Sequence, residues 1–287
     1  MKHTRSKNNG MTRHMRMLAI LMVPVVALIL GAAALEGWAQ DDPPVCWFNI
    51  ELNATDLDVG VRGFFDFDPW NDLTIQNPNG DEIADVMASN GLADQGFAEW
   101  FFESGEPMLG DGEPPYTFAI FLARFPESGE DDFYVFTAVP NAGDSETCYA
   151  EFTHVIPCAP EISAAGNRGL GVTISWDPVT QVVDTAATDA SIALGGEEVE
   201  CVTPASALVI KGYEVIVETE VDGEDKRYTI ELPGDATRVK VPPEFIALGD
   251  EFQYEVLAIE DSGNQTITEE DFCVNERNGR VVECPDE

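Results

Sequence analysis

Basic residues and histidine are scarce in this chain. Its 287 residues include 15 Lys and Arg against 53 Asp and Glu, and only three His. The net charge of −38 repels nucleic acid and anionic lipid surfaces, which excludes the basic surface typical of a nucleic-acid-binding protein. Only His154 lies beyond the first 39 residues, so multi-His metal sites are excluded as well.

Motifs for catalysis and for nucleotide binding are also missing. There is no Gly-x-Ser-x-Gly elbow, and neither Gly-rich phosphate loop pattern occurs. Carboxylates are so abundant that any two could be nominated as the acid pair of a glycosidase, which makes their presence uninformative. We therefore expect no catalytic residues and no cofactor, with a small extracellular hydrolase as one alternative.

Long apolar runs are limited to one segment near the N-terminus. Residues 17–34 are uncharged and apolar, five Lys and Arg precede them, and Gly37-Trp38-Ala39 supplies small residues at −3 and −1. This pattern predicts an export signal, residues 1–39, cleaved after Ala39. The alternative is an uncleaved anchor, because the run reaches the length of a membrane span. After cleavage we expect no membrane span and a secreted, extracellular, cell-surface or periplasmic location.

Acidic residues are distributed over the whole remaining chain. Residues 1–39 hold five of the 15 basic and one of the 53 acidic residues, leaving 10 against 52. Aromatic and β-branched residues alternate with the acids throughout, so a core can form. A saline habitat or a need for solubility explains this surface. Calcium binding is the alternative, since carboxylate oxygens are the ligands that calcium prefers.

The six cysteines predict disulfides, because an even number in an exported protein favours them over thiol chemistry. Six cysteines allow 15 connectivities. Cys46 and Cys148 bracket the first half, and Cys273 and Cys284 enclose a hairpin turn at Asn278-Gly279. These positions lead us to expect the pairs Cys46–Cys148, Cys158–Cys201 and Cys273–Cys284.

A Pro-rich joint at residues 156–162 divides the rest of the chain in two. Before it, alternating runs separated by Asp, Asn, Gly and Pro predict an acidic β-sandwich over residues 40–157. The strands are expected at residues 47–52, 60–65, 116–121, 133–139 and 148–155. Residues 92–104 carry Leu92, Phe97, Trp100 and Phe101 at helical spacing, which predicts a short helix there.

Two Asp-rich turns are the candidate metal sites of this first half. They place side-chain oxygens at alternate positions, as hard cations prefer. The residues are Asp56, Asp58, Asp66, Asp68 and Asp72. The competing interpretation is that these residues simply form turns and strand ends.

Aromatic residues suggest a second kind of site in the same half. Exposed rings could stack on sugars, and the candidates are Trp70, Trp100, Phe101 and Phe102. Packing of the same rings in the core is the alternative. Their exposure decides between the two.

The second half resembles the fibronectin type III domain, over about residues 159–273. The resemblance lies in an ordered set of residues along its alternating runs: Trp176, Tyr213, Leu248, Tyr254 and Ala258. It implies strand A at 160–162, B at 172–176, C at 212–218, a strand at 227–232, E at 237–241 and F around 252–258. It also implies a corner in which Leu248 precedes Tyr254 and the Tyr hydroxyl ties the crossing chain.

Residues 179–209 depart from the family, which has a short loop between strands B and C. Long loops in compact domains are usually functional or disordered. This one contains Cys201, and we expect an extra hairpin held by its disulfide.

The expected fold is therefore all-β, with two tandem β-sandwich domains. The second is immunoglobulin-like, of the fibronectin type III kind, over residues 158–275, and residues 276–287 form a C-terminal hairpin or tail. The expected function is non-catalytic binding or adhesion, with an extracellular protein or a polysaccharide as partner. A carbohydrate-binding accessory protein is the other alternative to the hydrolase.

Overall fold

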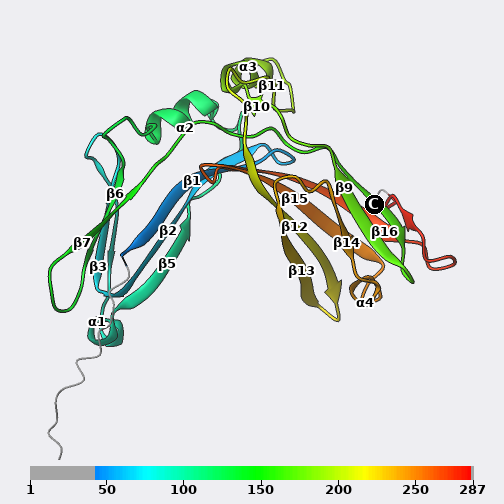
Figure 1. The fold of residues 1–287 in the computed structure, drawn as a ribbon. Coiled ribbons are helices and arrows are strands. Elements are labelled where there is room, and N and C mark those ends of the chain that lie inside the picture. Colours follow the sequence, from blue (N-terminus) through cyan, green and yellow to red (C-terminus); the bar gives the residue numbers. More distant parts are fainter. Residues whose placement is uncertain (1–42, 286–287) are drawn as a thin grey trace, which may run out of the picture. The chain divides into compact units, whose positions relative to one another are not determined.

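The structure is a computed structural model that describes residues 43–285. These residues form an all-β fold of two sandwiches, as expected from the sequence (Figure 1). The predicted export signal, residues 1–39, lies outside the described residues.

The first sandwich packs two sheets over an aromatic core. One sheet contains β1 (Val45–Asn53), β2 (Asp58–Trp70) and β5 (Phe97–Glu103). The other contains β4 (Glu82–Met87), β3 (Asp72–Gln76), β6 (Tyr134–Val139) and β7 (Glu146–Ala150). Phe48, Phe65, Trp70 and Phe136 are fully buried, and the Phe65 and Phe136 rings stack with centroids 6.0 Å apart. Burial of such rings is the main stabilising term of this half.

The helix predicted over residues 92–104 is wrong. Only α1 (Gly91–Gln95) is helical, and Gly96, at φ +78°, ends it before β5. In β5, Trp100 and Phe102 are partly buried while Phe101 between them is exposed, which is the alternation of a strand. Aromatic residues favour strands when a neighbouring strand is available, and here β2 pairs with β5.

The strand predicted at residues 116–121 is wrong as well. This segment begins α2 (Phe118–Arg124), whose Ile120 N–H donates to the Thr117 hydroxyl. Phe118 and Phe121 are buried, three residues apart on one helical face. A capping Thr and this spacing are helix signals that the aromatic run obscured.

The second sandwich also has two sheets. One contains β13 (Glu224–Pro233), β12 (Ile210–Val221), β15 (Glu251–Glu260) and β16 (Gln265–Val274), with β17 (Val281–Val282) paired to β16. The other contains β14 (Arg238–Val241), β9 (Gly171–Trp176) and β8 (Ile162–Asn167). The buried Trp176 and Tyr213 rings join them, with centroids 5.1 Å apart. The expected strands at 172–176, 212–218 and 227–232 lie within β9, β12 and β13, and the strand expected at 237–241 is β14, which begins one residue later. Strand A begins at Ile162 rather than residue 160.

The corner expected from Leu248 and Tyr254 differs in the structure. Leu248 is 47% exposed, whereas Ile246, in α4 (Pro243–Ile246), is fully buried. The Tyr254 hydroxyl donates to the side chain of Glu270, 2.8 Å away, and not to an upstream backbone carbonyl. Phe252, two residues earlier, is buried, and its ring lies 6.1 Å from that of Phe245 in α4.

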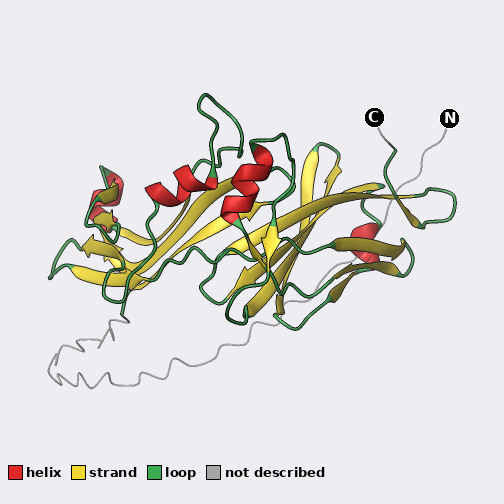
Figure 2. Ribbon diagram, turned by 90° about the horizontal axis from the view of Figure 1, so that it is seen from above, coloured by secondary structure: helices red, strands yellow, loops and turns green. Residues whose placement is uncertain are grey.

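Residues 179–209 form a small insert rather than an irregular loop. β10 (Val182–Val183) pairs with β11 (Cys201–Val202), and α3 (Thr185–Ile192) lies between them. Asp189 on α3 accepts the N–H groups of Phe118 (2.7 Å) and Ala119 (3.0 Å) at the start of α2. The two helices therefore lie side by side (Figure 2).

The two sandwiches are joined by a continuous sheet. β1 pairs in parallel with β16, which places Glu51 beside Gln265 and Asn53 beside Ile267. The described residues, 43–285, accordingly belong to one compact unit. It stays a prediction that the chain before residue 158 and the chain from residue 158 onwards are separate domains that fold independently.

Three disulfides link the described residues, and their pairs are those expected from the sequence. Cys46–Cys148 ties β1 to β7, Cys158–Cys201 holds the 179–209 insert, and Cys273–Cys284 closes the C-terminal hairpin. Their Cα atoms are 6.0, 6.2 and 4.9 Å apart, within the usual range for a disulfide.

Candidate functional site

An exposed aromatic patch lies on the outer face of β1, β2 and β5. Phe64 is the register partner of both Trp47 and Phe101, so the three rings form a row across the strands. Val45, two residues before Trp47, extends the row's apolar surface. Phe101 is 50% exposed and Val45 53%. We call Val45, Trp47, Phe64 and Phe101 the aromatic patch.

The strand period places these side chains outside. Phe48, Ile50 and Leu52 point into the core, so the alternate residue Trp47 points away from it. The Trp47 and Phe64 rings stack with centroids 5.8 Å apart, and Phe101 meets Trp47 edge-on at 5.9 Å. These contacts fix the rings in position before any partner binds.

Charged groups border the patch on both sides. Asp66 and Glu99 form the neighbouring register pair on one side, and Arg62 and Glu103 form it on the other. The Arg62 guanidinium lies 5.7 Å from the centre of the Trp47 ring. An apolar centre with a charged rim is the arrangement found in protein–protein interfaces, where Trp and Arg contribute much of the binding energy.

Arg62 connects the patch to the junction of the two sandwiches. It pairs with Glu51 at 3.0 Å and donates to the Gln265 side-chain oxygen at 2.7 Å. The Gln265 amide in turn donates to Glu51. The rim of the patch and the β1–β16 ladder therefore share one polar network.

A group of carboxyls adjoins this network. Glu106 lies close enough to Glu51 for their charges to repel, and it packs over Gly60, where a Cβ would lie 2.7 Å from Glu106 Cγ. Burial, followed by the charge of Glu51, raises the pKa of Glu106 to about 7. Burial also raises the pKa of Glu51, against the opposing effect of Arg62.

The residues predicted to bind a metal ion do not lie together: they are spread along β2 and its preceding turn, and one begins β3 of the other sheet. Asp56 and Asp58 lie at one end of β2, Asp66 and Asp68 near its other end, and Asp72 begins β3. Within residues 43–285, no group of three or more His, Cys, Asp or Glu side chains is placed to hold a metal ion. Calcium binding by these residues stays a prediction, which calorimetric titration with millimolar calcium tests.

Of the four aromatic residues singled out from the sequence, Phe101 alone is exposed. Trp70 is fully buried and its indole N–H donates to the Ala98 carbonyl at 3.3 Å. Trp100 and Phe102 stack on each other on the inner face, with centroids 4.6 Å apart. Trp47 and Phe64 were not among the predicted site residues, although the alternation of buried residues in 47–52 gives Trp47 the outward position.

The single His beyond the predicted signal has a structural environment. The His154 ring hydrogen-bonds the Phe125 carbonyl at 2.8 Å, and its backbone N–H donates to Glu127.

Within the described residues, no helix is both long and apolar enough to cross a membrane.

Comparison with known proteins gives similarities of fold only. No family model and no curated protein matches the sequence. Among solved structures, the FN1–FN3 domains of chicken CNTN1 align with 11% identity over 79% of this chain and 65% of that one, with a TM-score of 0.34. A two-domain fibronectin type III segment of chicken tenascin aligns with 11% identity, over 81% of this chain and 99% of that one, at a TM-score of 0.25.

Bacterial and repeat adhesion proteins give similar values. A structure of a 1.5-MDa bacterial ice-binding adhesin aligns with 12% identity over 80% of this chain and 64% of that one, at a TM-score of 0.21. At these levels the functions of those proteins do not transfer to this chain, and the aromatic patch has to be interpreted from its own geometry.

Proposed function

We propose that this chain is an extracellular, non-catalytic binding or adhesion protein that recognises another protein through the aromatic patch. The observation that carries the proposal is the row Trp47–Phe64–Phe101, which is ordered by its own contacts, with Phe101 50% exposed and the other two rings partly exposed. Exposed apolar patches with charged rims mark interaction sites. The predicted export signal and the three disulfides support an extracellular location.

The second sandwich serves in this proposal as a scaffold. Its resemblance to the fibronectin type III domain, used mostly as a spacer or binding module, fits that role. The pairing of β1 with β16 and the hydrogen bond from Arg62 to Gln265 connect the strands of the patch to the second sandwich. A site on strands held at both ends is more precise than one on a free loop.

A protein partner fits the patch better than a polysaccharide. Sugar rings need a flat aromatic face that is free, and Trp47 already has Phe64 stacked on it and Arg62 over its ring. Phe101 alone is widely exposed. A polysaccharide partner is therefore an outcome of the test rather than part of the proposal.

The test uses arrays of extracellular proteins and of polysaccharides, probed with the purified chain and two variants. Phe101→Ala removes an exposed ring of the patch, and Tyr149→Ala removes an exposed ring on β7 of the other sheet. We expect binding to one or more proteins that weakens at least tenfold in Phe101→Ala and stays within twofold in Tyr149→Ala. Equal binding by all three forms, or binding to polysaccharides alone, would contradict the proposal.

A further inference from the structure

β5 is an outer strand of the sheet that carries the aromatic patch. Within residues 43–285 its strand partner is β2 alone. The Ser104 N–H, just beyond β5, donates to the Val61 carbonyl of β2 at 2.8 Å. Because backbone groups point to alternate sides along an antiparallel strand, those of Glu99, Phe101 and Glu103 point away from β2. These three residues therefore present their N–H and C=O groups at an open sheet edge.

The side chains of the same three residues lie on the face of the aromatic patch. Phe101 belongs to the patch, where its register partner is Phe64. Glu99 and Glu103 lie two residues to either side of Phe101, so the strand period places all three side chains on one face. Both carboxylates are exposed, and Phe101 is 50% exposed. One segment laid along β5 therefore reaches backbone groups, an aromatic ring and two carboxylates together.

The two carboxylates of this edge have no basic partner. Neither Glu99 nor Glu103 forms an ion pair in the part of the chain that the structure describes. Arg62, the register partner of Glu103, pairs instead with Glu51 at 3.0 Å. Asp66, the register partner of Glu99, adds another acid. Basic side chains on an added strand would lie opposite these acids, and opposite charges across strands stabilise their pairing.

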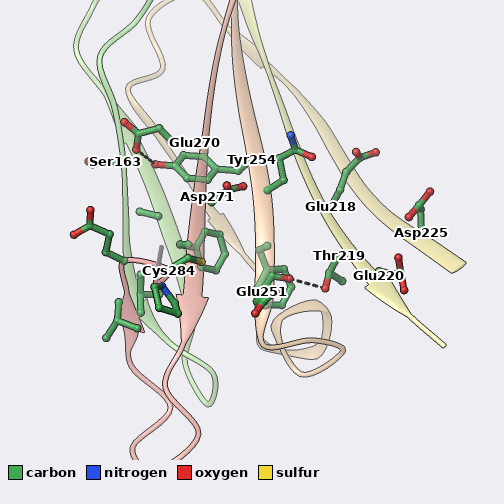
Figure 3. A pocket seen from close by; sticks show the side chains of 18 residues that line it. Ser163, Glu218, Thr219, Glu220, Asp225, Glu251, Tyr254, Glu270, Asp271 and Cys284 are labelled. Carbon is green, nitrogen blue, oxygen red and sulfur yellow. Dashed lines mark hydrogen bonds between the residues drawn. The ribbon is translucent and has the colours of Figure 1, made fainter. Parts of the chain in front are cut away.

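The other outer strand of this sheet, β13, lacks this combination. Its exposed residues include Asp225, Arg227 and Glu231, which carry charges of both signs, as protected sheet edges do. Asp225 also borders the hollow shown in Figure 3, where the aromatic residues Tyr254 and Phe272 are at most 2% exposed and belong to the core. A segment laid along β13 would therefore meet charges without an exposed aromatic ring.

A second copy of this chain fits the β5 edge poorly. Antiparallel pairing of two β5 strands centred on Phe101 would place Glu99 of each copy opposite Glu103 of the other. Like charges directly opposite destabilise a strand pair, and the net charge of −38 adds repulsion between copies. The charges of the edge favour a basic segment of a different protein.

We propose that an extended segment of another protein adds to β5 as a further antiparallel strand and carries an apolar residue with Lys or Arg two positions to each side. The apolar side chain packs on Phe101, and the basic side chains pair with Glu99 and Glu103. Main-chain hydrogen bonds to the open edge contribute affinity, as in other cases of strand addition. This inference rests on the proposed function, since it names the chemistry of the partner that the aromatic patch recognises.

The probe is a labelled nine-residue peptide with Ile at its centre, Lys two residues to each side and Thr elsewhere. A second peptide has Glu in place of each Lys. Their affinities for the purified chain are measured by fluorescence anisotropy at about 0.15 M salt, where distant charges are screened. The test variant is Glu99→Lys/Glu103→Lys. The control is Asp225→Lys/Glu231→Lys, which makes the same change of charge on β13.

We expect the wild-type chain to bind the Lys peptide at least tenfold more tightly than the Glu peptide. This preference should fall at least tenfold in the test variant and less than twofold in the control. No binding of the Lys peptide to the wild-type chain, or equal losses of preference in the two variants, would overturn the proposal.

Methylation of single peptide nitrogens tests the added strand. In an antiparallel pair only alternate N–H groups face the neighbouring strand, and that of the Ile opposite Phe101 faces β5. N-methylation of this Ile should weaken binding at least tenfold, whereas N-methylation of the next Thr should weaken it less than threefold. Equal effects of the two methyl groups, or a greater loss from the one on Thr, would overturn antiparallel strand addition.

Peptide and array results together separate this inference from the proposed function. If proteins on the array bind in a manner that depends on Phe101 while the Lys peptide does not bind, the aromatic patch stands as a site and strand addition to β5 is wrong. If the Lys peptide binds as expected while no protein on the array does, the proposed function is wrong and the binding chemistry of the β5 edge stands.

Discussion

The side-chain oxygen of Asn264 accepts the backbone N–H of Ile50 at 2.7 Å, across 214 residues of sequence. The Asn264 amide donates to the carbonyls of Thr153 (2.9 Å) and Val155 (2.8 Å), and the residue is 1% exposed. One side chain in the β15–β16 turn therefore links three segments: β1, the end of the first sandwich and the second sandwich. Its side chain supplies a partner for β1 at the position where the pairing of β1 with β16 ends, because β16 begins at the next residue.

Replacing Asn264 should destabilise the chain as a whole. Asn264→Ala leaves the Ile50 N–H and two carbonyls buried without partners, each costing about 1–3 kcal/mol. We expect the free energy of unfolding to fall by about 3 kcal/mol in urea denaturation. Asn278→Ala, in an exposed turn, should change it by less than about 0.5 kcal/mol. A loss under 1 kcal/mol for Asn264→Ala would show that the junction does not depend on this residue.

The carboxyls beside the junction should make stability depend on pH. The pKa of Glu106 is raised from 4.5 to about 7, chiefly by burial, and that of Glu255 to about 7 by burial and Glu269. Between pH 4.5 and 7 the unfolded chain loses these protons while the folded chain keeps them. The free energy of unfolding should therefore fall as the pH rises through this window.

A pair of variants isolates the contribution of Glu106. Glu106→Gln keeps a neutral side chain at every pH, so we expect its unfolding free energy at pH 8 to exceed that of the wild type. Its decline between pH 4.5 and 7 should be shallower. Glu82→Gln, on β4 of the other sheet, serves as the charge-matched control. Parallel pH profiles for Glu106→Gln and the wild type would contradict this account.

Strand periodicity and cysteine positions predicted much of the fold, since both depend on local pattern. The alternation in residues 47–52 and 212–218 gave strands, and the spacing of Cys273 and Cys284 gave a hairpin. The predicted helix at 92–104 contains a strand at 97–103, and the predicted strand at 116–121 overlaps a helix at 118–124. Closely spaced aromatic residues fit the period of either element. A capping Thr117 and the helix-ending Gly96 were the local signals that decide between them.

The binding surfaces depended on pairings that no local pattern contains. Trp47, Phe64 and Phe101 become neighbours only through the β1–β2–β5 register. The parallel pairing of β1 with β16 joins residues more than 200 positions apart, and nothing in either strand specifies it. The two Asp-rich turns were conspicuous in sequence, and β2 holds Asp58 of the first and Asp66 of the second eight residues apart, about 26 Å along a strand, so the two turns do not form one common site.

Trp70 and Phe101 differ in exposure, so replacing each by Ala should lower the free energy of unfolding by different amounts. Trp70 is fully buried and stacks on Phe97 with centroids 4.7 Å apart. Trp70→Ala should lower the free energy of unfolding by about 3–5 kcal/mol. Phe101→Ala, at a half-exposed position, should cost less than about 1 kcal/mol. Comparable losses in chemical denaturation would mean that Phe101 is a core residue and not part of a binding surface.

The Cys158–Cys201 disulfide should control the contact between the 179–209 insert and α2. It closes a loop of 43 residues, so Cys158→Ser/Cys201→Ser should cost about 2–4 kcal/mol of unfolding free energy. Asp189 on α3 accepts the Phe118 and Ala119 N–H groups. When the insert is no longer held, these two amides should exchange with solvent faster.

Hydrogen exchange followed by mass spectrometry measures this effect, and the C-terminal disulfide supplies the control. Cys273→Ser/Cys284→Ser opens a loop of 11 residues at the hairpin and should leave exchange at Phe118 and Ala119 unchanged. Peptide mapping without reduction tests the connectivity itself, and a peptide joining Cys201 to Cys273 would contradict it. If both double variants accelerated exchange at α2 equally, general loss of stability rather than release of α3 would be the cause.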